Sequence, residues 1–148
     1  MSHQLFINLP VTNVEASKAF YTSLGWTLNP DFSDDNAAAI VVSETIHLMV
    51  LSHDHFRQFT SKEIADTTST TAAIHALSVE APEDIDSLLA RAVDAGATEG
   101  MTQDHGFMRS RSFADPDGHE WEIMWIDPIA AAGDWDAVQQ KYSQPSDA

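Results

Sequence analysis

The sequence predicts an α+β fold made of two units, each with the order strand, helix and then further strands. In each half a short apolar strand leads into a helix, and a glycine follows where that helix should end. Val11 and Val79 close the two leading strands, and Gly25 and Gly96 follow the two helices. The repeat lies in the order of the elements and not in residue identity. We therefore expect two βαβββ modules within a single domain, residues 1–148.

The first module is expected at about residues 5–57. Thr12-Asn13-Val14-Glu15 matches the capping-box pattern, in which a hydroxyl residue and a Glu three positions later satisfy free backbone N–H groups, so it predicts a helix start. Gly25 suits the position just after the helix, where a left-handed backbone is favoured. Two apolar runs at 38–42 and 46–51, separated by a short polar link, predict a hairpin.

The second module is expected at about 72–128, after a polar linker at about 58–71. Pro82 stands where a first helical residue is favoured. The apolar residues behind it have the i, i+3, i+4, i+7 spacing of an amphipathic helix, namely Ile85, Leu88, Leu89 and Ala92. The remaining expected elements are strands at 73–79, 107–113 and 120–126, the turn Asp115-Pro116-Asp117-Gly118, and a tail helix at about 134–142.

Composition excludes several classes of protein. Hydrophobic residues make up 43% of the chain, which argues against a disordered protein. Asp and Glu number 23 against seven Lys and Arg, a formal charge of -16 that repels nucleic acid and anionic membrane surfaces. The absence of cysteine rules out thiol catalysis, disulfides and thiolate metal sites. No signal-peptide pattern and no apolar run of membrane-spanning length occurs, so we expect a cytoplasmic protein.

Three stretches of the chain resemble one protein superfamily. They are residues 9–26, with Phe20-Tyr21 and Leu24-Gly25; residues 106–113; and residues 113–125, which contain Asp115-Pro116-Asp117-Gly118 and Trp121-Glu122. Together they are similar to the glyoxalase/bleomycin-resistance/extradiol-dioxygenase (vicinal-oxygen-chelate) superfamily, in its bacterial lactoylglutathione lyase-like branch, over roughly residues 5–128. The resemblance implies that the two modules form a curved mixed sheet around a cavity.

The resemblance also implies four metal-ligand positions, one on each of four strands, which are usually His residues and a final Glu. In this chain they fall on Phe6, Met49, Ile74 and Glu122, of which only Glu122 suits a hard divalent ion. A shift of one residue would bring His75 to the third position, but the repeat pairs Phe6 with Ile74. We therefore expect no cofactor and disfavour a divalent metal.

The same positions define a candidate ligand site, because alternate residues of a strand share a face. The predicted ligand-binding residues are Phe6, Asn8, His47, Met49, Ile74, Arg111 and Met124. Glu122 is the candidate general base. Arg111 matches the pattern of the branch and would recognise an anionic substrate or pair with Glu122; the alternative is a surface salt bridge.

Two functions stay open. A non-catalytic protein that binds a small, partly apolar ligand fits Phe6, Met49 and Ile74 better. A metal-dependent lyase, isomerase or dioxygenase would act on a small oxygenated substrate, with Glu122 as its base. Tightly bound metal with turnover would exclude the first function. By resemblance we also expect a homodimer.

Overall fold

The computed structural model describes residues 3–143 of the chain. Module one consists of β1 (Leu5–Val11), α1 (Val14–Ser23), β2 (Thr27–Asn29), η1 (Pro30–Phe32), β3 (Ala37–Val41), β4 (Ile46–Ser52), α2 (His53–Phe56) and η2 (Arg57–Phe59). Module two consists of β5 (Ile74–Ser78), α3 (Pro82–Asp94), β6 (Thr98–Asp104), β7 (Met108–Ala114) and β8 (Glu120–Ile126). Two short helices follow, α4 (Pro128–Ala131) and α5 (Trp135–Tyr142).

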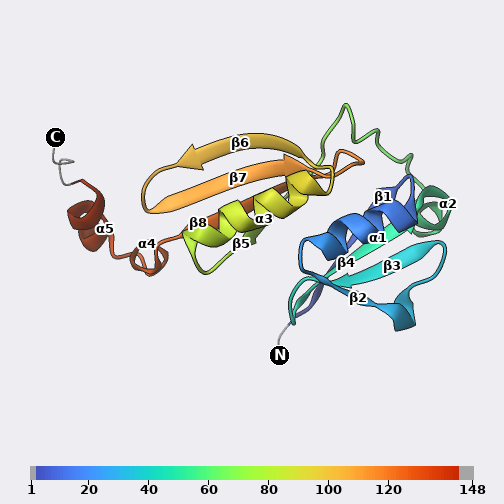
Figure 1. The fold of residues 1–148 in the computed structure, drawn as a ribbon, viewed down its shortest axis with the longest axis horizontal. Coiled ribbons are helices and arrows are strands. Elements are labelled where there is room, and N and C mark those ends of the chain that lie inside the picture. The colour runs from blue at the N-terminus through green and yellow to red at the C-terminus, as the bar shows by residue number, and fades with distance from the viewer. Residues whose placement is uncertain (1–2, 144–148) are drawn as a thin grey trace.

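Each module forms a mixed four-stranded sheet, and the two sheets have equivalent strand orders, β1-β4-β3-β2 and β5-β8-β7-β6. The leading strand is parallel to the last strand in both modules, and the other pairs are antiparallel. The modules lie side by side along the long axis of the molecule, with α1 and α3 on the same side of the two sheets (Figure 1). The predicted α+β fold of two βαβββ modules is confirmed, but the two sheets do not close into one.

A shared core joins the helices to one face of each sheet. Residues from β1, β3 and β4 of module one and from β7 and β8 of module two are buried together with the apolar faces of α1 and α3. Trp121 and Tyr21 are the largest fully buried side chains, and they lie where the modules meet. Burial of this face stabilises the fold through the hydrophobic effect, whereas the opposite face of each sheet carries no helix.

The start of α1 differs from the predicted capping box. Asn13 is the N-cap, and its side chain accepts a hydrogen bond from the backbone N–H of Ala16 at 3.0 Å. Glu15 instead forms an ion pair with Lys18 one turn later. Thr12 is left free to contact the second module, as described below. The capping-box prediction was therefore wrong by one residue, although it located the helix.

Strand β6 was absent from the sequence prediction. All its residues are exposed, so the alternation of apolar and polar residues that marks a half-buried strand is missing. Its pairing with β7 also shifts register between Glu99 and Thr102. The tail helix α5 lies beyond module two at the far end of the molecule (Figure 1). None of the helices within residues 3–143 combines the length and the apolar composition of a membrane span.

Candidate functional site

The uncovered face of module one carries a pocket of about 540 Å³. Strands β1 and β4 place four predicted residues on this face in two neighbouring cross-strand pairs, Phe6 with His47 and Asn8 with Met49. The wall continues across β3, the end of β2 and η1 to include Ala39, Val41, Asn29 and Phe32. No charged side chain lines it within the described residues. This arrangement suits an uncharged, largely apolar ligand.

Two stacked rings form one wall of this pocket, and we call them the aromatic platform. The rings of Phe6 and His47 lie 4.5 Å apart between centroids and only 10° from parallel. Nε2 of His47 lies 3.0 Å from Oε1 of Gln4, which fixes the orientation of the imidazole. Phe6 is 54% exposed, and Phe32, which lines the same pocket, is 69% exposed. Such large apolar surfaces open to solvent provide contact area for a flat ligand.

A separate pocket of about 260 Å³ lies on the uncovered face of module two. It contains the other two metal-ligand positions of the resemblance, Ile74 on β5 and Glu122 on β8. Glu122 is half-buried and lies opposite Ser112 of β7. Within residues 3–143 no hydrogen bond or ion pair joins Glu122 to another side chain. The two pockets share no lining residue, so the predicted site residues are divided between the modules.

Arg111 and Met124 do not lie in either of these pockets. Arg111 belongs to β7, and Nη1 of its guanidinium forms an ion pair with Asp86 of α3 at 2.7 Å. Its other contact is with Glu99. Arg111 therefore lies on the helix-covered side of the sheet and pairs with these carboxylates and not with Glu122. Met124 is half-buried on β8 beside Ser110.

His75 lies on the face opposite Ile74, as the repeat suggested. It pairs in register with Trp121, and the two rings lie 5.0 Å apart between centroids. Desolvation, followed by the charge of His119, lowers the pKa of His75. His75 therefore shares a face with Trp121, opposite the face of Ile74 and Glu122.

The side chains at the four metal-ligand positions do not suit a divalent ion. Three of them, Phe6, Met49 and Ile74, offer no hard donor atom, and Glu122 stands alone in the second pocket. Within the described residues no group of three His, Asp or Glu side chains is placed to hold an ion. The donor set thus lacks the ligands that a tight zinc, nickel or iron site requires.

Sequence reasoning missed the residues that close the first pocket from the side. Asn29 and Phe32 lie in a polar, turn-rich stretch that shows no strand periodicity. Asn29 caps the short helix η1 by accepting a hydrogen bond from the N–H of Asp31 at 3.1 Å, and this turn places Phe32 beside the platform. A lone Phe within a polar stretch was the available signal, because such a residue needs an apolar neighbour.

Comparisons with known proteins agree with this architecture. The family model described as "Glyoxalase/Bleomycin resistance protein/Dioxygenase superfamily" matches residues 3–123. A search of curated proteins gave no match. The solved structures that the chain resembles include a glyoxalase-related enzyme from Fulvimarina pelagi, with a TM-score of 0.72 and 22% identity, covering 87% of this chain and 91% of that one.

Two further structures give the same result. A glyoxalase/bleomycin resistance protein/dioxygenase family enzyme from Burkholderia phytofirmans PsJN has a TM-score of 0.69 and 16% identity, covering 84% of this chain and 99% of that one. A glyoxylase/bleomycin resistance protein/dioxygenase domain from Frankia sp. EAN1pec has a TM-score of 0.65 and 26% identity, covering 85% and 93%. Identities this low support a shared fold only, so the chemistry of the site has to be inferred from the residues present in this chain.

Proposed function

We propose that this chain, which belongs to the glyoxalase/bleomycin resistance protein/dioxygenase superfamily, binds a small ligand on the uncovered face of module one. The aromatic platform of Phe6 and His47 is the observation that carries this proposal. The two rings are stacked face to face, so His47 holds Phe6 in place, and the exposed part of the Phe6 ring remains as a preformed apolar surface for a ligand. Met49 and Phe32 add apolar contact, and Asn8 supplies a polar group for orientation.

The charge of the chain narrows the class of ligand. A formal net charge of -16 repels anions over the whole surface, and no cation lines the pocket to compensate. We therefore propose a planar ligand that is neutral or positively charged. A cation would gain further from the face of Phe6 through a cation–π contact.

We propose that binding proceeds without a divalent metal. The donor chemistry at the four ligand positions supports this, since three of the four side chains offer no hard donor atom. Elemental analysis of the purified, untagged protein after gentle dialysis should give far less than one metal ion per chain. Near-stoichiometric zinc, nickel, iron or manganese would overturn the proposal.

Ligand binding is tested by titrating planar aromatic compounds while observing the methyl groups of isotope-labelled methionine by NMR. Met49 lines the pocket, so its signal should shift. Phe6→Ala should weaken binding at least about fivefold, because an aromatic contact contributes about 1 kcal/mol beyond its buried area and about 1.4 kcal/mol is a tenfold change. Phe59→Ala is the matched control, since Phe59 is 71% exposed and does not line the pocket. Equal affinities for the two variants would refute the platform as the binding surface.

A second candidate function is catalysis of the lactoylglutathione lyase type, with Glu122 as the general base. The half-buried Glu122, with no partner among the described side chains, favours this candidate. The assay is turnover of the thiohemiacetal of methylglyoxal and glutathione with added Zn²⁺ or Ni²⁺, comparing the parent with Glu122→Gln. Turnover that Glu122→Gln abolishes would establish catalysis, and its absence from the parent would exclude this substrate.

We also propose that the chain forms a homodimer in the cytoplasm, in which a second copy covers part of the open sheet faces. Large apolar side chains on those faces are exposed, with Ile74 at 58% and Met101 at 72% in module two. Covering them would remove apolar surface from water. Light scattering should give twice the 16.2 kDa mass of the chain. A monomeric mass would refute the dimer.

A further inference from the structure

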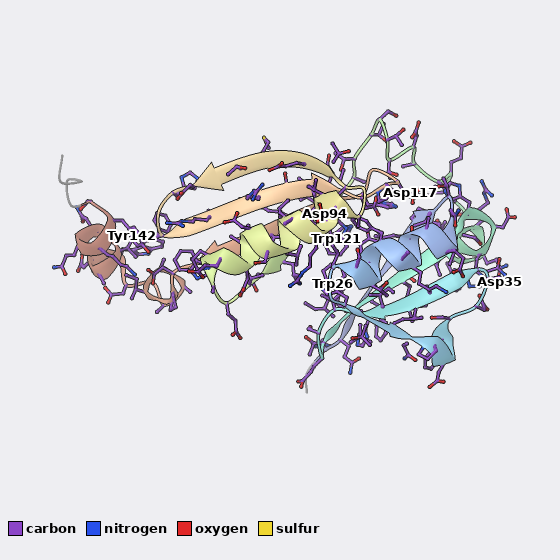
Figure 2. All side chains as sticks on the ribbon, viewed as in Figure 1. Trp26, Asp35, Asp94, Asp117, Trp121 and Tyr142 are labelled. Carbon is purple, nitrogen blue, oxygen red and sulfur yellow. The ribbon has the colours of Figure 1, made fainter. Side chains whose placement is uncertain are left out.

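The turn between β7 and β8, residues 115–119, makes polar contacts to module one that the ligand pocket does not use. The carboxylate of Asp117 accepts hydrogen bonds from the backbone N–H and the hydroxyl of Thr12, at 3.0 and 2.8 Å. A longer contact of 3.4 Å comes from Ser17. Asp117 thereby lies at the N-terminal end of α1 (Figure 2), where a negative charge is favourable.

The same turn carries a buried carboxylate that is fully occupied. One oxygen of Asp115 accepts the hydroxyl of Tyr21 in module one at 2.5 Å. The other accepts the backbone N–H groups of Asp117 and His119 at 3.0 and 2.8 Å. The hydroxyl oxygen of Tyr21 accepts in turn from the indole of Trp121 at 3.1 Å. Burial raises the pKa of Tyr21, so its hydroxyl keeps the proton that it donates.

Two more contacts close the turn against module one and the linker. Nε2 of His119 lies 2.7 Å from the carbonyl oxygen of Pro10 on the free edge of β1. The hydroxyl of Thr67 donates to the carbonyl of Asp117 at 2.5 Å. Gly118 has a φ of +89° and lies so close to Thr67 that a Cβ there would be 2.2 Å from its carbonyl oxygen. The turn is thus held by β1, α1 and the linker together.

We propose that residues 115–119 are a latch that sets the angle between the two modules, with Asp117 as a positioning residue for a ligand pocket that it does not touch. The rest of the junction consists of ring contacts, such as Trp26 against Trp121 at 5.4 Å (Figure 2), and a longer hydrogen bond of 3.3 Å from the guanidinium of Arg91 to the carbonyl of Leu24. Apolar contact has little directional preference, whereas hydrogen bonds have a defined geometry. The latch holds Pro10 and Thr12 at the end of β1, the strand that also presents Phe6 to the ligand. Only this last step rests on the proposed function.

The test measures the distance between the modules directly and needs no ligand. The chain has no cysteine, so spin labels can be attached to the exposed Asp35→Cys in module one and Asp94→Cys in module two (Figure 2). In the labelled parent the distance distribution should be narrow. Asp117→Ala removes the acceptor for both donors of Thr12, and the distribution should broaden and gain a longer population.

Two controls separate a latch from a residue that merely stabilises the fold. Asp117→Asn keeps an acceptor oxygen and should restore most of the narrow distribution. Leu48→Ala removes a fully buried side chain within module one and should lower the melting temperature while leaving the inter-module distance unchanged. An unchanged, narrow distribution in Asp117→Ala would overturn the latch, and it would leave the ligand titration free to succeed or fail on its own.

Discussion

Replacement of Tyr21 by Phe removes a single hydroxyl from the centre of the molecule. Tyr21 has no solvent exposure, and its hydroxyl serves two partners in module two. It donates to the carboxylate of Asp115 and accepts from the indole N–H of Trp121. The ring of Phe keeps the apolar packing, so the substitution isolates the polar contribution. Both former partners then remain buried with one hydrogen bond fewer.

The size of the effect follows from those two lost partners. A buried polar group left unsatisfied costs about 1–3 kcal/mol, so Tyr21→Phe should lower the free energy of unfolding by about 2–6 kcal/mol. Domains are stable by only about 5–15 kcal/mol, so this is a large fraction of the total. For a chain of this size about 2 kcal/mol corresponds to a fall in Tm of about 4–8 °C.

The stability lost in Tyr21→Phe should also depend on pH. Burial, the largest influence, raises the pKa of Asp115, and the hydrogen bond from Tyr21 lowers it. A carboxyl with a raised pKa contributes stability that is present below its unfolded pKa and is lost as pH rises through its folded pKa. The ionised form needs the Tyr21 donor most. The stability difference between Tyr21→Phe and the parent should therefore be larger at neutral pH than in mild acid.

The assay is urea unfolding followed by tryptophan fluorescence and by circular dichroism at both pH values. Tyr142→Phe is the matched control, because Tyr142 is only half-buried and Asp127, which accepts its hydroxyl, keeps Lys141 as a second partner. This control should lose much less stability. A similar small loss for both variants would show that the Tyr21 network contributes no more than the hydrogen bond of the half-buried Tyr142, and the reasoning would be refuted.

Three further predictions follow from the same structure. A non-glycine residue with a left-handed backbone costs about 1–2 kcal/mol. Gly118→Ala should lower the free energy of unfolding by more than this, because the new Cβ would lie 2.2 Å from the carbonyl oxygen of Thr67. Gly133→Ala has open space around the new Cβ and should show only the backbone cost in urea unfolding. Hydrogen bonds from Lys141 and Tyr142 lower the pKa of Asp127 to about 2. The stability that these bonds give is therefore present above the ordinary carboxyl pKa and is lost as pH falls toward about 2. The fluorescence of Trp135 should change over that pH range as α5 is released, and a constant fluorescence would contradict this prediction. The formal charge of -16 implies repulsion between like charges on the folded chain. Raising the salt from about 0.01 to about 0.15 M shortens the Debye length from about 30 to about 8 Å and should therefore raise Tm. A fall in Tm would contradict this screening argument.

The repeated order of elements was predictable from sequence because each signal is local. Apolar runs marked the buried strands β3 and β4, the i, i+3, i+4 spacing marked α3, and glycines marked both helix ends. Strand β6 had no such signal, since Thr98–Asp104 is exposed throughout and interrupted by a register shift. Its position depends on pairing with β7, which is a tertiary contact. The shift of the N-cap to Asn13 is also tertiary in origin, because Thr12 bonds to Asp117 of the other module.

The candidate site was predictable only as far as strand alternation reaches. Alternation placed Phe6 with Asn8 and His47 with Met49, and the register of β1 with β4 brings these pairs together. It could not show that Glu122 lies in a different pocket, because that depends on how two sheets are placed relative to each other. It also could not assign a face to Arg111, whose partner Asp86 comes from α3. The roles of these residues in ligand binding stay predictions.

The turn Asp115-Pro116-Asp117-Gly118, which lies in one of the three stretches that resemble the family, also makes polar contacts between the modules. Asp115, Asp117 and Gly118 contact α1 or the linker, and none of them lies in the pocket of the aromatic platform. A change at the junction turn would disturb both modules, whereas a change at Phe6 or Met49 alters only the surface of one pocket. Folding therefore depends on the contacts of the turn, whereas the pocket residues determine only the chemistry of the surface that they line. For this reason membership of the family fixes the fold of the chain, and its function has to be inferred from the pocket residues themselves.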